Sequence, residues 1–131
     1  MTDYEDLMGV ARTAAEQAYA PYSRFRVGVV VVADDGRTFT GCNVENAAYG
    51  SAICAEANAI STAAAAGVRS IATVVVACPD GTECYPCGNC RQLMREFDTQ
   101  TVVVQDPRGG VRTHAFADLF PHSFGPEDLP H

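Results

Sequence analysis

Three cysteines in two separate segments restrict the fold of this chain more than any other feature. Cys54 opens Cys54-Ala55-Glu56, and Cys87 and Cys90 follow in Pro86-Cys87-Gly88-Asn89-Cys90. A fold that brings these thiolates together creates a three-sulfur zinc site, which leaves one position of a tetrahedral ion open. A water can fill that position, and a carboxylate two residues from a ligand, at Glu56, can take its proton. The pattern therefore indicates hydrolytic chemistry rather than a structural metal clip.

Composition and charge exclude several classes of protein. Of the 131 residues, 47% are hydrophobic and 19% are charged, so one compact domain over residues 1–131 is expected. The net charge of -7 and the absence of lysine leave no basic surface for a long nucleic acid. The acidic start does not look like a signal peptide, and no apolar run is long enough for a membrane span. We therefore expect a cytoplasmic location, with reduced cysteines that favour metal binding over disulfides.

The pattern of apolar residues predicts helices that alternate with strands. β-Branched runs and tight turns mark the strands, and a proline or glycine ends the first two helices. Because strands alternate with helices, we expect a sheet that is covered on both faces. In chain order the predicted elements are a helix at 3–19 capped by Thr2 and Glu5, strands at 27–33 and 37–44, a helix at 53–66, a strand at 71–77, a helix at 88–97, strands at 101–105 and 111–114, and a helical turn at 117–120.

The predicted metal site lies at the start of two of these helices. Cys54 begins one helix, and Cys87 and Cys90 lie at the beginning of the other. Unpaired N–H groups and partial positive charge at helix N-termini favour thiolate over thiol. Two intervening residues let one turn present both Cys87 and Cys90 to one ion, and Glu56 shares the first turn with Cys54.

Other interpretations of the cysteines are weaker. A redox pair, or two unrelated core cysteines, would explain Cys87 and Cys90 taken alone. The Cys54-x-Glu56 motif, and the start of both motifs at helices, favour a metal site. The three remaining cysteines are typical of small buried hydrophobic residues, although one lies near Cys87 and is kept as an alternative ligand; they are Cys42, Cys78 and the alternative ligand Cys84.

Together these segments resemble the cytidine deaminase family, in its small form that binds zinc through three cysteines. Four motifs occur in the family's order: a first-strand motif, a nucleoside-binding segment, the zinc motifs and a C-terminal segment. They are residues 21–28, residues 41–50, Cys54-Ala55-Glu56 with residues 86–92, and Leu119-Phe120-Pro121 with Phe124. The resemblance implies an α/β fold, a three-layer α/β/α sandwich with a mixed five-stranded sheet. It also implies a homotetramer with one Zn²⁺ per subunit.

The resemblance further implies hydrolytic deamination of cytidine and 2′-deoxycytidine to uridine and 2′-deoxyuridine, with release of ammonia, a reaction of pyrimidine salvage. Cys54, Cys87 and Cys90 would hold the zinc, and zinc-bound hydroxide would attack C4 of the pyrimidine. Glu56 would take the proton of the water and then deliver protons to N3 and to the leaving amine.

The residues that hold the nucleoside are also implied by the resemblance. Asn43 and Glu45 would bind the ribose. An amide and a carboxylate can both hydrogen-bond a sugar hydroxyl, and burying them without such a partner would be costly. Phe25 would stack on the base, and the Ala55 backbone would contact its edge. A neighbouring subunit would contribute the 47–49 stretch and a C-terminal aromatic residue, namely Ala47, Tyr49 and Phe124. Ordinary packing in the core, at a strand end or within one subunit is the alternative for these side chains.

The chain departs from the family after its catalytic Glu, where Ala57 replaces a common Arg. Three thiolates and Zn²⁺ sum to about -1, which weakens the ion as a Lewis acid. We expect the helix N-termini, Arg91 or Gln92 to offset this charge. Tyr85 stands where Ser is usual before Pro-Cys, which leaves substrate details open.

Three other functions remain open from the sequence. A blasticidin S-type deaminase shares the Cys-Ala-Glu and Pro-Cys-Gly-x-Cys motifs, but the intact ribose segment at residues 43–46 favours an ordinary nucleoside. A zinc-stabilised binding module without catalysis has no need of Glu56. A polynucleotide editor is disfavoured by the acidic charge and by cysteine, rather than histidine, as the first ligand.

Overall fold

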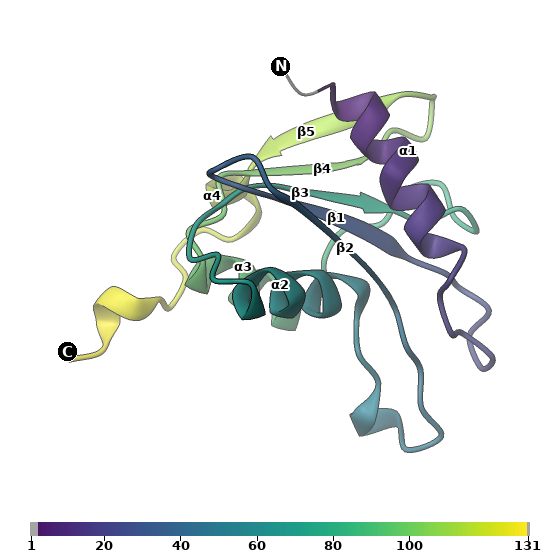
Figure 1. Ribbon diagram of the computed structural model, residues 1–131, viewed down its shortest axis with the longest axis horizontal. Helices are drawn as coiled ribbons and strands as arrows, with labels where there is room; N and C mark the ends of the chain where they lie inside the picture. Colours follow the sequence, from purple (N-terminus) through teal and green to yellow (C-terminus); the bar gives the residue numbers. More distant parts are fainter. Residues whose placement is uncertain (1–2, 131) are drawn as a thin grey trace.

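The computed structural model describes residues 3–130 and places a five-stranded sheet between two helical layers (Figure 1). The strand order is β2-β1-β3-β4-β5; β3 and β4 are parallel, and all the other neighbouring pairs are antiparallel. This arrangement confirms the expected α/β fold with a mixed sheet. The elements are α1 (Tyr4–Ala15), β1 (Gly28–Ala33), β2 (Thr38–Cys42), η1 (Tyr49–Ser51), α2 (Ala55–Ala65), β3 (Ile71–Ala77), α3 (Gly88–Glu96), β4 (Thr101–Gln105), β5 (Val111–Ala115), α4 (Phe116–Leu119) and η2 (Pro126–Asp128), where η denotes a 3₁₀-helix.

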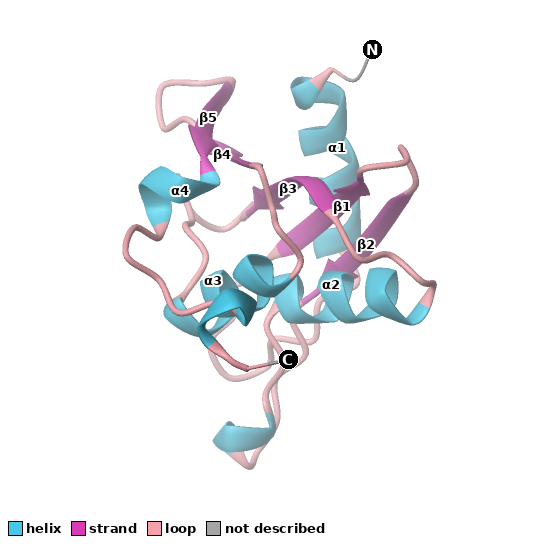
Figure 2. Cartoon of the chain, turned by 90° about the vertical axis from the view of Figure 1, so that its left-hand side faces the viewer, coloured by secondary structure: helices cyan, strands magenta, loops and turns pink. Residues whose placement is uncertain are grey.

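Alternating valines on the three central strands hold both helical layers against the sheet. Successive side chains of a strand point to opposite faces, so a strand covered on both sides reads as a continuous apolar run. Helix α1 packs on one face, whereas α2 and α3 lie on the other (Figure 2). The valines that face α1 are Val30, Val32, Val75 and Val103, and those of the opposite face are Val29, Val31, Val74, Val76, Val102 and Val104.

The first helix ends four residues earlier than its apolar pattern predicts. The Tyr19 N–H donates to the Asn43 carbonyl at 2.9 Å, and the Glu45 N–H donates to the Tyr19 carbonyl at 2.8 Å. This pairing with the segment after β2 competes with the helix and pulls Tyr19 into extended structure. At the other end, Asp3 is the N-cap and accepts a hydrogen bond from the Glu5 N–H at 2.8 Å. Thr2, expected to cap the helix, lies outside the described residues.

The remaining elements follow the predicted order. Strands β3 and β4 have the predicted bounds, and the final helical turn begins one residue early, at Phe116. The two 3₁₀-helices, η1 and η2, carry no periodic apolar signal and were not predicted. Within residues 3–130, the helices are too short or too polar to cross a membrane.

Candidate active site

Helix α2 is held at a fixed depth against β2 by a close contact at Gly41. A Cβ at this position would lie 2.5 Å from the Ala59 backbone nitrogen and 2.8 Å from the Ala55 carbonyl oxygen. Only glycine allows the helix backbone to approach the strand so closely. The contact fixes the first turn of α2, where Cys54 is the N-cap.

The beginnings of α2 and α3 bring three thiols together. Cys87 is the N-cap of α3, and Cys90 lies in the first turn of the same helix. The sulfur atoms of Cys54, Cys87 and Cys90 all lie within 4.8 Å of one another. Zn–S bonds of about 2.3 Å in a tetrahedron place sulfurs roughly 3.8 Å apart, so this donor set fits Zn²⁺. All six cysteines are free thiols, and Cys84 does not belong to this cluster.

The three thiols differ in their tendency to ionise. Burial acts against ionisation of Cys87, but hydrogen bonds from the backbone and thiol of Cys90 and from the thiol of Cys54 outweigh it and lower the pKa of Cys87. Burial is the main cause of the raised pKa of Cys54 and of the raised pKa of Cys90. The negative charge of nearby Glu56 raises the pKa of Cys90 further. Three thiolates at this separation repel one another, so a bound cation would stabilise them and displace their protons.

Glu56 lies in the first turn of α2, beside this cluster, and its side chain is nearly removed from solvent. The residue is 5% exposed, and burial raises the pKa of its carboxyl group. Glu56, Cys54 and Cys87 line one cavity of about 320 Å³. A carboxyl group with a raised pKa, at the edge of a cavity, is suited to accept and return a proton at neutral pH.

The same cavity brings together four of the residues expected to contact a nucleoside. Its lining includes Phe25, Asn43, Glu45 and Ala55. The Asn43 side chain donates to the Phe25 carbonyl at 2.9 Å and accepts from the Val27 N–H at 2.8 Å. The cavity wall at Phe25 is therefore fixed by Asn43, a structural role that sequence reasoning did not assign.

Glu45 is tied to the loop that precedes Phe25. Its carboxylate accepts hydrogen bonds from the Tyr22 N–H at 3.0 Å, from the Ser23 N–H at 3.1 Å and from the Ser23 hydroxyl. The bond from the Ser23 hydroxyl is the main cause of the lowered pKa of Glu45. An ionised Glu45 therefore holds one rim of the cavity. Sequence reasoning missed Ser23, although it lies only two residues before Phe25.

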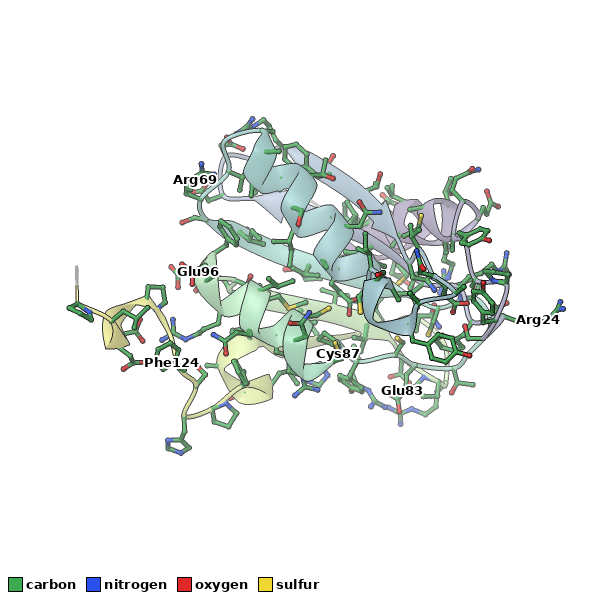
Figure 3. The ribbon with its side chains drawn as sticks, turned by 90° about the horizontal axis from the view of Figure 1, so that it is seen from below. Arg24, Arg69, Glu83, Cys87, Glu96 and Phe124 are labelled. Atoms are coloured by element: carbon green, nitrogen blue, oxygen red, sulfur yellow. The ribbon has the colours of Figure 1, made fainter. Side chains whose placement is uncertain are left out.

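Other predicted residues lie outside this cavity in the same subunit. Ala47 is exposed, Tyr49 is 80% exposed and Phe124 is 56% exposed. Tyr49 lines a second hollow of about 400 Å³, which shares Ser23 and Glu45 with the first. Figure 3 shows Phe124 on the C-terminal tail, well separated from Cys87.

The two residues expected to temper the thiolate charge bond to backbone carbonyls. The Arg91 guanidinium donates to the Pro86 carbonyl at 2.8 Å and to the Leu119 carbonyl at 2.6 Å. The Gln92 side chain donates to the Phe124 carbonyl at 2.9 Å. These bonds tie α3 to the loop before it and to the C-terminal tail.

Tyr85, which stands where the family usually has Ser, lines the cavity. Its hydroxyl group hydrogen-bonds the His114 Nε2 at 3.1 Å, and the two rings meet edge to face. Its place directly before Pro86-Cys87 had marked Tyr85 in the sequence, but the bond to His114 joins residues far apart in the chain.

Comparison with known proteins agrees with the site. Residues 1–106 match the family described as the cytidine and deoxycytidylate deaminase zinc-binding region. The chain is 42% identical over 130 residues to a cytidine deaminase of Mycobacterium tuberculosis (strain ATCC 25618 / H37Rv), which covers 98% of this chain and 94% of the relative. It is 40% identical over 129 residues to a cytidine deaminase of Sporosarcina psychrophila, covering 97% and 95% of the two chains.

Solved structures give the same result at the level of the fold. The crystal structure of cytidine deaminase from Burkholderia pseudomallei superimposes with a TM-score of 0.85 at 44% identity, over 95% of this chain and 100% of that one. The structure of cytidine deaminase from Mycobacterium tuberculosis gives a TM-score of 0.83 at 38% identity, over 95% and 99%. The match of the zinc-binding region, the full-length relatives and the three-thiol cluster together show that this chain belongs to the cytidine and deoxycytidylate deaminase family.

Proposed function

We propose that this chain hydrolyses cytidine and 2′-deoxycytidine to uridine and 2′-deoxyuridine and releases ammonia. The observation that carries the proposal is the three-thiol cluster beside buried Glu56, in a cavity of a size that small ligands occupy. We propose that residues 1–131 act as one domain. We also propose a cytoplasmic location, where thiolate ligands remain reduced.

The proposed chemistry divides between the metal and Glu56. Zn²⁺ held by Cys54, Cys87 and Cys90 would polarise a water and lower its pKa. Glu56 accepts one proton as the water oxygen bonds to C4, and it passes that proton to N3. It then carries the proton of the new hydroxyl group to the amine, which leaves as ammonia while the C4 carbonyl forms. The buried carboxyl group of Glu56 suits this shuttle because its raised pKa makes the carboxylate a stronger base for each proton that it accepts.

The proposed nucleoside contacts use groups that keep spare hydrogen-bonding capacity. Asn43 and Glu45 each hold the cavity wall, yet an amide carries two N–H donors and a carboxylate carries about four acceptor sites. Both can therefore bind ribose hydroxyls without losing their structural bonds. Phe25 would stack on the base, and the Ala55 backbone would contact its edge.

Activity assays test the proposed reaction. Zinc-loaded protein is incubated with cytidine, 2′-deoxycytidine and blasticidin S, and both ultraviolet absorbance and ammonia are followed. We expect both nucleosides to be deaminated faster than blasticidin S. A protein that binds zinc and leaves both nucleosides unchanged would defeat the proposal, and a clear preference for blasticidin S would redirect it to the antibiotic.

We further propose that the active form is a homotetramer in which Ala47, Tyr49 and Phe124 reach a neighbouring cavity. Five large hydrophobic side chains are exposed on the segments around η1 and β2, and two of them line the hollow that adjoins the cavity, an arrangement typical of interaction surfaces. Two of the rings, those of Tyr22 and Tyr49, meet edge to face at 6.2 Å, and β-bridges pair the backbone of Val44 with those of Tyr19 and Ile53. The five side chains are those of Tyr19, Tyr22, Val44, Tyr49 and Ile53.

Mixed oligomers test the contribution of Phe124. We expect Phe124→Ala to raise KM for cytidine by about tenfold, the scale of one lost aromatic contact with a base. Co-expression with Glu56→Gln subunits, which are inactive but carry Phe124, is expected to restore a population of sites with wild-type KM. Native mass spectrometry measures the subunit number. If no such sites return, Phe124 acts only within its own subunit.

A further inference from the structure

The loop between β3 and Pro86 approaches the Phe25 ring closely at Gly81. A Cβ built at Gly81 would lie 2.9 Å from Cε1 and 3.1 Å from Cζ of Phe25. Carbon atoms at such a separation overlap, because favourable contact begins at about 3.5 Å. The ring therefore lies against the Gly81 backbone, in a place that any side chain at position 81 would fill.

The backbone of this loop is held by Gln105, a buried residue at the end of β4. Its Oε1 accepts from the Cys78 N–H at 2.7 Å. Its Nε2 lies 3.3 Å from the Cys78 carbonyl, 3.4 Å from the Gly81 carbonyl and 3.3 Å from the Thr82 carbonyl, and donates to them. The backbone that carries position 81 is therefore anchored to the sheet. It cannot easily shift away from Phe25 to make room for an added methyl group.

The backbone around Phe25 is fixed as well. The carboxylate of Asp80 accepts hydrogen bonds from the Arg26 N–H at 2.9 Å, from its Nε at 3.0 Å and from its Nη2 at 2.8 Å. The Phe25 N–H donates to the Ser23 hydroxyl at 3.0 Å, and its carbonyl accepts from Asn43. With both backbones held, the ring of Phe25 is the part that moves when the contact at Gly81 is crowded.

From these contacts we infer that Gly81 is a positioning residue for substrate binding, which sets how far the Phe25 ring projects into the cavity. The inference rests on the proposed function, in which Phe25 faces the base. A side chain at position 81 pushes the ring into the space of the pyrimidine and weakens nucleoside binding. The chemical step is spared, because Glu56 and the three thiols are presented by α2 and α3 rather than by this loop.

A double-mutant cycle tests the inference. Gly81→Ala is expected to raise KM for cytidine about tenfold, to weaken competitive inhibition by uridine by the same factor, and to leave kcat within about twofold. In a Phe25→Ala background the same substitution is expected to change KM by less than about twofold, since the ring it displaces is gone. Gly9→Ala is the matched control, because a Cβ at Gly9 meets nothing within 4 Å.

The outcomes separate this inference from the proposed function. Inactive wild-type enzyme defeats the proposed function. An equal rise of KM in both backgrounds, or a fall of kcat with KM unchanged, overturns the role of Gly81 while the function stands. A crystal structure of Gly81→Ala with the Phe25 ring unmoved overturns it irrespective of activity. Should Gly81→Ala fold poorly, the double variant with Phe25→Ala is expected to recover, and its failure to recover also counts against the inference.

Discussion

Replacement of Glu56 with Gln is expected to lower kcat for cytidine by about 10³- to 10⁴-fold while zinc stays bound. Glutamine matches the size of the side chain but neither accepts nor returns a proton. A positioned acid–base group contributes about 10²- to 10⁴-fold, and Glu56 is proposed to act in both halves of the reaction, so the upper part of that range applies. Single-turnover kinetics with metal analysis of the same samples measures both quantities.

Thermal unfolding supplies the control for this variant. Burial raises the pKa of Glu56 above its unfolded value, so its contribution to stability is fully present below the unfolded pKa of about 4.3 and is lost as pH rises through the folded pKa. Glutamine has no such dependence. The metal-free Glu56→Gln variant is therefore expected to melt at or above the wild-type Tm at pH 7. Loss of zinc, or a Tm far below wild type, would assign Glu56 a structural role instead.

Replacement of Cys90 with Ala is expected to remove both zinc and activity. Cys90 is the buried member of the cluster, and two thiolates at helix ends are left without it. We expect bound zinc to fall from about one per subunit to near zero after dialysis, with at least a 10³-fold loss of kcat/KM. Zinc at 100 times its Kd stabilises a folded protein by about 2.7 kcal/mol, and this rise in Tm is also expected to disappear.

Cys84→Ala is the matched control, because Cys84 lines the same cavity but does not belong to the cluster. Burial raises the pKa of Cys84 to about 12, so the residue remains a thiol. This variant is expected to retain wild-type zinc content. Equal loss of zinc from the Cys84 and Cys90 variants would contradict the ligand assignment.

Much of the fold follows from local patterns, because the elements that carry it are short and strongly biased. The valine runs of β3 and β4 predict their own bounds, and the glycine after α2 predicts its end. The thiol cluster was also predictable, since two ligands lie within one helical turn and the third begins another helix. Within each element these features depend on residues close together in the sequence, and the approach of Cys54 to the Cys87 and Cys90 pair follows from the two motifs taken together.

The features that escaped prediction depend on contacts between distant segments. The end of α1 is set by pairing between Tyr19 and the strand segment after β2. The ties of Asn43 to Phe25, and the contact of Gly81 with the same ring, join residues far apart in the chain. No local periodicity encodes such contacts. The contacts that shape the nucleoside side of the cavity were therefore harder to predict from the sequence than the metal ligands.

The N-termini of two helices face the negative charge of the three thiolates, where Ala57 replaces the common Arg. Cys54 and Cys87 are both N-caps, so the positive ends of α2 and α3 converge on the cluster. Arg91 lies in the first turn of α3 and is held there by the carbonyls of Pro86 and Leu119. The two helix N-termini are therefore positioned to offset part of the thiolate charge, and a share for Arg91 in this role stays a prediction.

Deamination of a cytosine nucleoside by zinc and Glu56 acting together can be tested in one paired assay. Wild-type protein and Glu56→Gln, each with about one zinc per subunit, are mixed with cytidine and 2′-deoxycytidine, and ammonia is measured. We predict one ammonia for each nucleoside consumed by the wild type, and a rate at least 10³-fold lower for the variant. If zinc-loaded wild type releases no ammonia, the chain does not deaminate these nucleosides, and if the variant is as fast as wild type, Glu56 is not the proton shuttle.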